Sequence, residues 1–224
     1  MPSAISINSE DVLLAIDLQA DFMPGGALAV DRGDEIVSLV NRLARRFEHV
    51  VVTQDWHPAG HVSFASSHEG AQPFERRRLA YGDQTLWPEH CVQGTPGAAL
   101  HPDLAVDRAF LILRKGMHAG IDSYSAFVEA DGKTTTGLSA LLKARGLKRV
   151  FACGLATDFC VAHSALDARA EGFTTFVIED VCRAIDANNS LSEAWARMNA
   201  AEVWRVQSAE ILGWRQRVPL SGES

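Results

Sequence analysis

Short apolar segments without polar alternation recur along the chain, and stretches with helical spacing lie between them. Residues 12–16 (Val-Leu-Leu-Ala-Ile) and 110–113 (Phe-Leu-Ile-Leu) are apolar throughout, which is typical of strands covered on both faces. Strands are predicted at residues 12–16, 50–53, 110–113, 149–153, 175–178 and 202–206. Helices are predicted at residues 34–47, 136–145, 158–171 and 188–200. This alternation predicts an α/β fold, a three-layer sandwich whose central, mostly parallel sheet is flanked by helices on both faces.

The composition favours a single domain spanning residues 1–224, with a frayed tail at 215–224. Hydrophobic residues make up 47% of the chain, and a chain of this length buries about 70% of its unfolded surface. The formal charge of −7 argues against nucleic acid or an anionic membrane as partner. No apolar run approaches the roughly 18 residues that span a bilayer, and no signal-peptide pattern is present. We therefore expect a cytoplasmic protein, either a monomer or a homo-oligomer.

Residues 54–107 do not follow the strand–helix pattern. This stretch has no sustained period, is rich in Gly, Pro, Ser and His, and contains five of the eight histidines. Irregular segments of this length in a compact domain are usually functional or disordered, and the Trp, Phe and His content disfavours disorder. We interpret it as a loop insertion that binds a metal ion.

Four chemically capable residues follow predicted strands: Asp17, Asp55, Lys115 and Cys160. Because parallel strands end at one edge of a sheet, the fold is expected to bring these side chains to a common rim. Taken singly, the aspartates are typical turn residues, the lysine a solvated side chain and the cysteine a small buried hydrophobe. Together they supply a base, a cation and a nucleophile.

Cys160 is the best-placed nucleophile of the four cysteines. It lies in the first turn of a predicted helix, where free N–H groups can stabilise a thiolate or an oxyanion. Cys153 lies inside a predicted strand and Cys182 follows one, so structural roles are expected for both. Disulfides are not expected in a long, core-rich chain without a secretion signal.

The Asp55-Trp56-His57 segment indicates a metal site. Asp and His two residues apart in extended backbone point to the same side, so both can reach one ion. His61 and His90 are candidates to complete the ligand set.

Five motifs, in this order, resemble those of nicotinamidases, which are isochorismatase-like cysteine hydrolases. The resemblance covers roughly residues 10 to 210. The motifs are Asp17-x-Gln19-x-Asp21-Phe22, Thr53-x-Asp55-Trp56-His57-Pro58, Trp87-Pro88-x-His90-Cys91, Lys115-Gly116 and Gly154-x-Ala156-Thr157-Asp158-x-Cys160-Val161.

The resemblance implies a catalytic triad of Asp17, Lys115 and Cys160. Asp17 would take the thiol proton, Lys115 would stabilise the charges, and Cys160 would attack the carboxamide of nicotinamide. An acyl-enzyme would then be hydrolysed to nicotinate, and pyrazinamide should be deamidated as well. The oxyanion hole would be the N–H groups of Ala156 and Cys160, with a cis peptide bond between Leu155 and Ala156.

The resemblance also implies one divalent metal ion held by Asp55, His57 and His90 that anchors the pyridine nitrogen. Zn²⁺ is expected first, with Fe²⁺ or Mn²⁺ as alternatives, because all three suit this ligand set. His61 is a possible fourth ligand. The residues expected to bind the substrate are Phe22, Trp87 and Leu155.

Three other functions are compatible with parts of these motifs. Another isochorismatase-like amidohydrolase would act on a carbamoyl or ureido substrate, for which a ring-anchoring ion has no use. A metal-activated water with an inert Cys160 would leave Asp17 and Lys115 without roles. A metal-binding scaffold without turnover would not need the triad.

Overall fold

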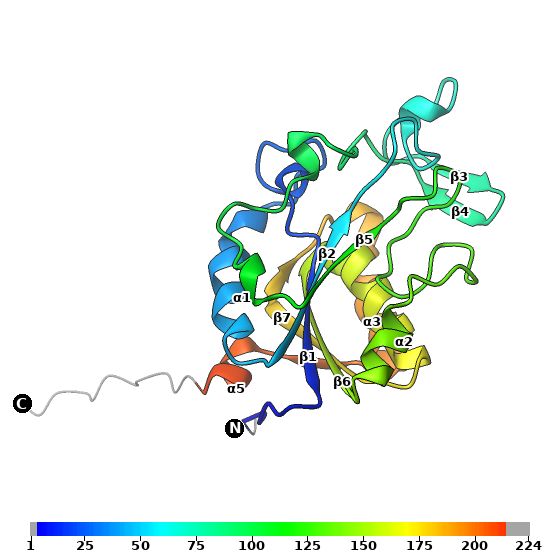
Figure 1. The fold of residues 1–224 in the computed structure, drawn as a ribbon. Helices are drawn as coiled ribbons and strands as arrows, with labels where there is room; N and C mark the ends of the chain where they lie inside the picture. Colours follow the sequence, from blue (N-terminus) through cyan, green and yellow to red (C-terminus); the bar gives the residue numbers. More distant parts are fainter. Residues whose placement is uncertain (1–3, 214–224) are drawn as a thin grey trace, which may run out of the picture.

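Six parallel strands form the central sheet of the computed structural model, which describes residues 4–213 (Figure 1). Their spatial order is β5-β2-β1-β6-β7-β8, and each pair of neighbours is parallel. The strands are β1 (Asp11–Ile16), β2 (His49–Asp55), β5 (Leu111–Lys115), β6 (Arg149–Leu155), β7 (Thr174–Arg183) and β8 (Trp204–Val206). Every residue of β1 is buried, as its unbroken apolar sequence predicts.

Helices cover both faces of this sheet. The helices are α1 (Val37–Ala44), α2 (Leu138–Ala144), α3 (Ala162–Ala170), α4 (Ser190–Ala200) and α5 (Ser208–Leu212). In Figure 1, α1 and α5 lie on one side of the sheet and α2 and α3 on the other. α1 contacts β1 and α5, whereas α3 packs on β6, β7 and α4. The predicted three-layer α/β sandwich is therefore confirmed.

The strand order reverses between β1 and β6. From β1 the chain proceeds through β2 to β5 at one edge, then returns to β6 beside β1 and continues to β8 at the other edge. In open parallel sheets, ligands bind outside the carboxyl ends of the strands at such a switch point. Asp17 directly follows β1, and Cys160 follows β6 after one turn of chain. The topology thus selects this end of the sheet for a site.

Some elements differ from the sequence prediction. The helix predicted at 158–171 begins with a π-helical turn (Thr157–Val161) before α3. The strand predicted at 202–206 is limited to β8, because Glu202 has a positive φ of 59°. An antiparallel hairpin, β3 (Arg76–Leu79) and β4 (Gly82–Thr85), and the short helix α5 were not predicted. The tail predicted at 215–224 lies outside the described residues.

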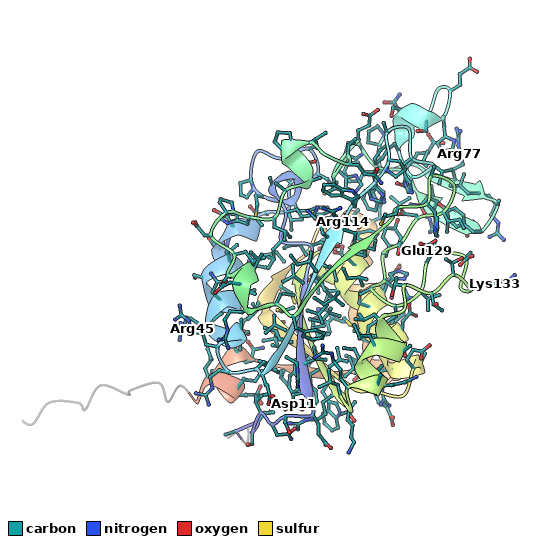
Figure 2. The ribbon with its side chains drawn as sticks, in the orientation of Figure 1. Asp11, Arg45, Arg77, Arg114, Glu129 and Lys133 are labelled. Carbon is teal, nitrogen blue, oxygen red and sulfur yellow. The ribbon has the colours of Figure 1, made fainter. Side chains whose placement is uncertain are left out.

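The first part of residues 54–107 lies over the carboxyl end of the sheet, where the hairpin projects from the molecule, and the last part returns beside α1 to the start of β5 (Figure 1). In Figure 2, Asp11 marks the amino end of the sheet and Arg114 lies toward the opposite, carboxyl end. The segment is anchored by fully buried aromatic side chains, Phe64 and Trp87. Among the helices of residues 4–213, none has the length and apolar character needed to cross a membrane.

Candidate active site

The three residues of the predicted triad meet at the carboxyl end of the sheet. Lys115, the last residue of β5, has its Nζ 2.8 Å from Oδ2 of Asp17 and 3.4 Å from Sγ of Cys160. All three residues are buried. Asp17 and Cys160 flank the switch point, and the long Lys115 side chain reaches them from the edge strand. The arrangement therefore places a carboxylate, an ammonium group and a thiol in mutual contact.

Two further acceptors hold the Lys115 ammonium group. Nζ donates to Oδ1 of Asp55 over 2.5 Å and to the backbone carbonyl of Ser123 over 3.0 Å. Buried ammonium groups need such partners, because desolvation without them is costly. Sequence reasoning missed Ser123, since a backbone carbonyl can come from any residue type and leaves no motif. The Ser123 carbonyl reaches Lys115 because the loop after β5 folds back toward the end of that strand.

Burial and the two carboxylates set the charges of this cluster. Burial alone would lower the pKa of Lys115, but Asp17 and Asp55 raise it well above its ordinary value, so the ammonium stays charged. Burial raises the pKa of the Cys160 thiol well above its ordinary value, and Lys115 only partly opposes this. The expected stabilisation of a thiolate by the helix start is therefore outweighed by burial. The resting thiol keeps its proton, and nucleophilic attack requires a base at hand.

The turn that carries Cys160 folds back onto Ala156. The Leu155–Ala156 peptide bond is cis, as the family resemblance implied. The carbonyl of Ala156 accepts the N–H groups of Phe159 and Val161 over 3.2 and 3.1 Å. This turn brings Cys160 and Ala156 to the wall of one cavity.

Asp55, His57 and His90 form a ligand set suited to a divalent metal ion. The Nε2 atoms of His57 and His90 lie 3.6 and 3.9 Å from Oδ2 of Asp55. Nδ1 of His57 lies 3.0 Å from the carbonyl oxygen of Gly116, and Nδ1 of His90 lies 2.9 Å from that of Pro88. A carbonyl only accepts, so each Nδ1 carries a proton, and each Nε2 is the ring atom left on the side of Asp55 to bind an ion. These residues, with one carboxylate oxygen and two imidazole nitrogens, fit Zn²⁺, Fe²⁺ or Mn²⁺.

The charge state of His90 suits metal binding. Burial and, to a smaller extent, the neighbouring His57 lower the pKa of His90 to about 4. A neutral imidazole is the form that binds a metal ion.

His61 lies beside this set and is engaged elsewhere. Its ring is 4.3 Å from that of His57, but Nε2 faces the carbonyls of His118 and Ile121 at 3.0 and 3.2 Å. Nδ1 lies 2.7 Å from the hydroxyl of Ser63. With both ring nitrogens engaged, His61 has no lone pair free for an ion in this arrangement. We therefore leave it out of the ligand set.

One cavity connects the nucleophile with the ligand set. Phe22 and Trp87, predicted to bind the substrate, line it, and Phe22 lies edge-on to His90. Leu155 is not among the lining residues: it is fully buried, and its side chain lies beside Gly33. The cavity is lined by Phe22, Leu28, Asp55, His57, Trp87, His90, Asp122, Tyr124, Ala156, Phe159, Cys160 and Ile185.

Two aromatic residues of the cavity wall were missed. Tyr124 accepts a hydrogen bond from Nε1 of Trp87 over 2.9 Å, and Phe159 packs edge-on against the same indole at 4.8 Å. Phe159 could have been found from its place next to Cys160. Tyr124 belongs to no motif, and only the fold brings it to Trp87.

The first motif positions the metal-binding segment as well as the base. The Gln19 side chain accepts the N–H of Asp55 over 2.7 Å and donates to its carbonyl over 2.8 Å. The Asp21 carboxylate accepts the N–H of Cys91, next to His90, over 2.7 Å. Three alternate residues of this motif therefore have separate roles. Asp17 belongs to the triad, Gln19 holds Asp55, and Asp21 holds the residue next to His90.

Comparisons with known proteins agree with this architecture. The isochorismatase domain model matches residues 11–210. The nicotinamidase of Acinetobacter baylyi is 54% identical over 200 residues, covering 89% of this chain and 94% of that protein. The solved structure of an Acinetobacter baumanii nicotinamidase/pyrazinamidase superposes with a TM-score of 0.90 at 55% identity, covering 91% of this chain and 98% of that one.

A third relative has been solved with a metal ion bound. The pyrazinamidase of Pyrococcus horikoshii, solved in complex with zinc, has a TM-score of 0.71 at 36% identity and covers 88% of this chain and 99% of its own. These matches extend over the whole sheet and both halves of the site. The chain therefore belongs to the isochorismatase family and, within that family, to the nicotinamidases.

Proposed function

We propose that this chain hydrolyses nicotinamide to nicotinate and ammonia through a cysteine acyl-enzyme, and that it deamidates pyrazinamide in the same way. One observation carries the proposal. A single buried ammonium group, that of Lys115, contacts the Asp17 carboxylate and the Cys160 thiol at the wall of an aromatic-lined cavity. Membership of the nicotinamidases supports the choice of substrate.

Acylation begins with the neutral thiol. Asp17 accepts the proton of Cys160 as Sγ bonds to the carboxamide carbon, and the carbonyl electrons move to oxygen. The N–H groups of Ala156 and Cys160 are proposed to stabilise this oxyanion. When the intermediate collapses, the C–N bond breaks, the nitrogen takes the proton from Asp17, and ammonia leaves.

Deacylation uses the same groups in reverse. Asp17 takes a proton from water as the water oxygen bonds to the thioester carbon. The C–S bond then breaks, and the proton returns from Asp17 to Sγ of Cys160. The charged Lys115 stays beside both residues throughout, so neither step leaves a buried negative charge without a counter-charge.

Asp55, His57 and His90 are proposed to hold one divalent metal ion, with Zn²⁺ first and Fe²⁺ or Mn²⁺ as alternatives. When bound, the ion would supply a Lewis-acid contact for the pyridine nitrogen of the substrate. The ligands come from the start and the later part of residues 54–107, so this loop is proposed as the metal-binding insertion of a single domain. Phe22 and Trp87 are proposed to flank the ring. A cytoplasmic location and a monomeric or homo-oligomeric state stay predictions.

The test is ammonia release by the purified, metal-loaded protein from nicotinamide and from a panel of ureido and carbamoyl compounds. We expect turnover of nicotinamide and pyrazinamide, and a nicotinoyl adduct on Cys160 in quenched reactions analysed by mass spectrometry. Faster turnover of a ureido compound than of nicotinamide would contradict the proposed substrate. Turnover without an adduct on Cys160, even when deacylation is slowed, would contradict the proposed mechanism.

A further inference from the structure

Thr53 is a buried neighbour of the proposed base that the mechanism above does not use. It lies in β2, which pairs with β1 in the register Ala15–Val52, so Thr53 is level with the end of β1, where Asp17 follows. Neither Thr53 nor Asp17 is exposed to solvent. Two hydrogen bonds join them: the N–H of Asp17 donates to Oγ1 of Thr53 over 3.1 Å, and that hydroxyl lies 2.5 Å from Oδ1 of Asp17.

The first of these bonds decides the direction of the second. A hydroxyl group has one proton to donate, and Oγ1 of Thr53 already accepts the N–H of Asp17. Its own proton is therefore free for Oδ1, which can only accept while the carboxylate is ionised. Asp17 has a positive φ of 52°, and this conformation turns its N–H toward Thr53. The two bonds hold both the backbone and the carboxylate plane of Asp17.

The two oxygens of Asp17 are left in different surroundings. Oδ1 is engaged by the Thr53 hydroxyl, whereas Oδ2 accepts no well-formed hydrogen bond from any residue between 4 and 213. Oδ2 lies 2.8 Å from Nζ of Lys115, and the same nitrogen lies 3.4 Å from Sγ of Cys160. Oδ2 thus lies beside the ammonium group that also contacts the thiol, and it has capacity to take a proton.

The residue type at position 53 also points to this contact. β2 contains three consecutive valines at positions 50–52, which suit a strand buried on both faces. Threonine has almost the shape of valine, but a buried hydroxyl is tolerated only with partners. The change from valine to threonine occurs at the position level with the end of β1, directly before Asp17, and both hydroxyl bonds go to Asp17.

We propose that Thr53 is a positioning residue that binds Oδ1 of Asp17 and so presents Oδ2 as the acceptor of the Cys160 proton. The inference rests on the proposed cysteine mechanism, in which Asp17 is the base. Without the hydroxyl, the carboxylate can rotate about its Cβ–Cγ bond and engage Lys115 with either oxygen. Fewer molecules then hold an acceptor aligned with the thiol at any moment.

The test compares Thr53→Val, which keeps the shape and removes the hydroxyl, with Thr53→Ser, which keeps the hydroxyl. Thr175→Val is the matched control, because Thr175 is equally buried in β7 and its hydroxyl bonds only the carbonyl of Phe173. The readouts are kcat and KM for nicotinamide, metal content, and the rate of Cys160 alkylation by iodoacetamide at fixed pH. Alkylation needs the proton transfer but no substrate.

We expect Thr53→Val to lower kcat and the alkylation rate by about tenfold to a hundredfold, with KM and metal content unchanged. Thr53→Ser and Thr175→Val should stay within about threefold of the wild type. If valine is not accommodated, Thr53→Ala tests the same hydroxyl. If the wild type releases no ammonia from nicotinamide, the proposed substrate fails, and the alkylation rates alone decide the role of Thr53.

Three results would overturn the inference. A folded Thr53→Val variant with wild-type kcat and alkylation rate would show that the hydroxyl does not position the base. A Thr53→Ser variant as slow as Thr53→Val would assign the effect to packing. Loss of metal in Thr53→Val would mean that the residue acts on Asp55, two positions along β2.

Discussion

Lys115 and Asp55 share a buried ion pair, with Nζ 2.5 Å from Oδ1, that joins the triad to the proposed metal centre. The other oxygen of Asp55 faces His57 and His90, so one carboxylate serves both groups. Burial would raise the pKa of Asp55, but Lys115 and His57 lower it well below its usual range. Asp55 therefore remains a carboxylate, and its Oδ1 remains a partner for Lys115, whether or not an ion is bound at Oδ2.

The first prediction concerns the nucleophile. Cys160→Ala should lower kcat/KM for nicotinamide by at least about a thousandfold, because the Cys160 thiol beside Lys115 is the group proposed to form the acyl-enzyme. Fold and nicotinamide binding should persist, since the change removes one small side-chain atom. Cys182→Ala is the control, because that thiol bonds the carbonyl of Ile178 and should be dispensable. Substantial residual turnover by the Cys160 variant in a coupled ammonia assay would exclude covalent catalysis.

The second prediction separates ring binding from thiol activation. Removing the metal by chelation, or by His90→Ala, should weaken nicotinamide binding and lower kcat/KM. Cys160 should still react with iodoacetamide at close to its original rate, because Lys115 keeps both carboxylates as partners. Alkylation is followed by mass spectrometry and folding by circular dichroism. A chelated protein that is folded but whose thiol is unreactive would mean that the ion helps to activate the nucleophile.

The third prediction concerns the substrate ring. Nicotinamide and pyrazinamide both have a ring nitrogen meta to the carbon that carries the carboxamide, whereas benzamide has none. If the ring nitrogen is anchored at Asp55, His57 and His90, benzamide should be a poor substrate, since positioning contributes several kcal/mol to catalysis. Initial rates of ammonia release measure the difference. Equal kcat/KM for benzamide and nicotinamide would contradict an anchored ring.

The fourth prediction concerns Gly116, which has a positive φ of 66° directly after Lys115. A Cβ there would lie 2.4 Å from Cε1 of His57, so Gly116→Ala should displace that ring and reduce metal content and kcat/KM. Gly132→Ala is the control, because Gly132 has a similar φ of 68° but open space around it. Both variants should lose about 1–2 kcal/mol for the left-handed backbone. Equal metal content in the two variants would contradict the prediction.

The fifth prediction concerns acid sensitivity. Burial and, to a smaller extent, the positive charge of Arg197 lower the pKa of His163 to about 4. The unfolded chain, with an ordinary histidine pKa of about 6.5, therefore binds this proton first, so stability falls as pH drops from about 6.5 toward 4. Between about pH 7 and pH 4.5, the free energy of unfolding of a variant without this histidine should therefore fall by about 2 kcal/mol less than that of the wild type.

Urea denaturation of His163→Gln and the wild type at both pH values measures this difference. The control is His101→Gln, which makes the same change of residue type in the loop before β5. An identical fall in the free energy of unfolding for His163→Gln and the wild type would contradict the assignment of acid sensitivity to this ring.

Much of this architecture could be predicted from local patterns. Short apolar segments located all six strands of the sheet. The inner strand β1 is buried at every position, as its unbroken apolar run predicts, whereas the edge strands β5 and β8 are partly exposed. The hairpin β3–β4 was not predicted, since three consecutive arginines at 76–78 resemble a solvated loop. The short α5 has too few residues for a periodic signal.

The site was predicted less completely than the fold. The motifs identified the residues that meet around Lys115 and around Asp55, and the fold brings both groups to one cavity. Three assignments depended on neighbours that no motif contains. His61 is engaged by the carbonyls of His118 and Ile121, Leu155 is not among the residues that line the cavity, and burial keeps the Cys160 thiol protonated.

The sequence by itself determined the strand–helix order, the family and the chemical identity of the reacting groups, because these depend on residue types and short spacings. Only the tertiary structure decided which atoms touch. Lys115 reaches Cys160 across 45 residues of chain, and Thr53 reaches Asp17 across 36, because the sheet places β1 between β2 and β6. Strand order, burial and backbone carbonyls are properties of the assembled fold, and they set the contacts and the protonation states on which the proposed chemistry rests.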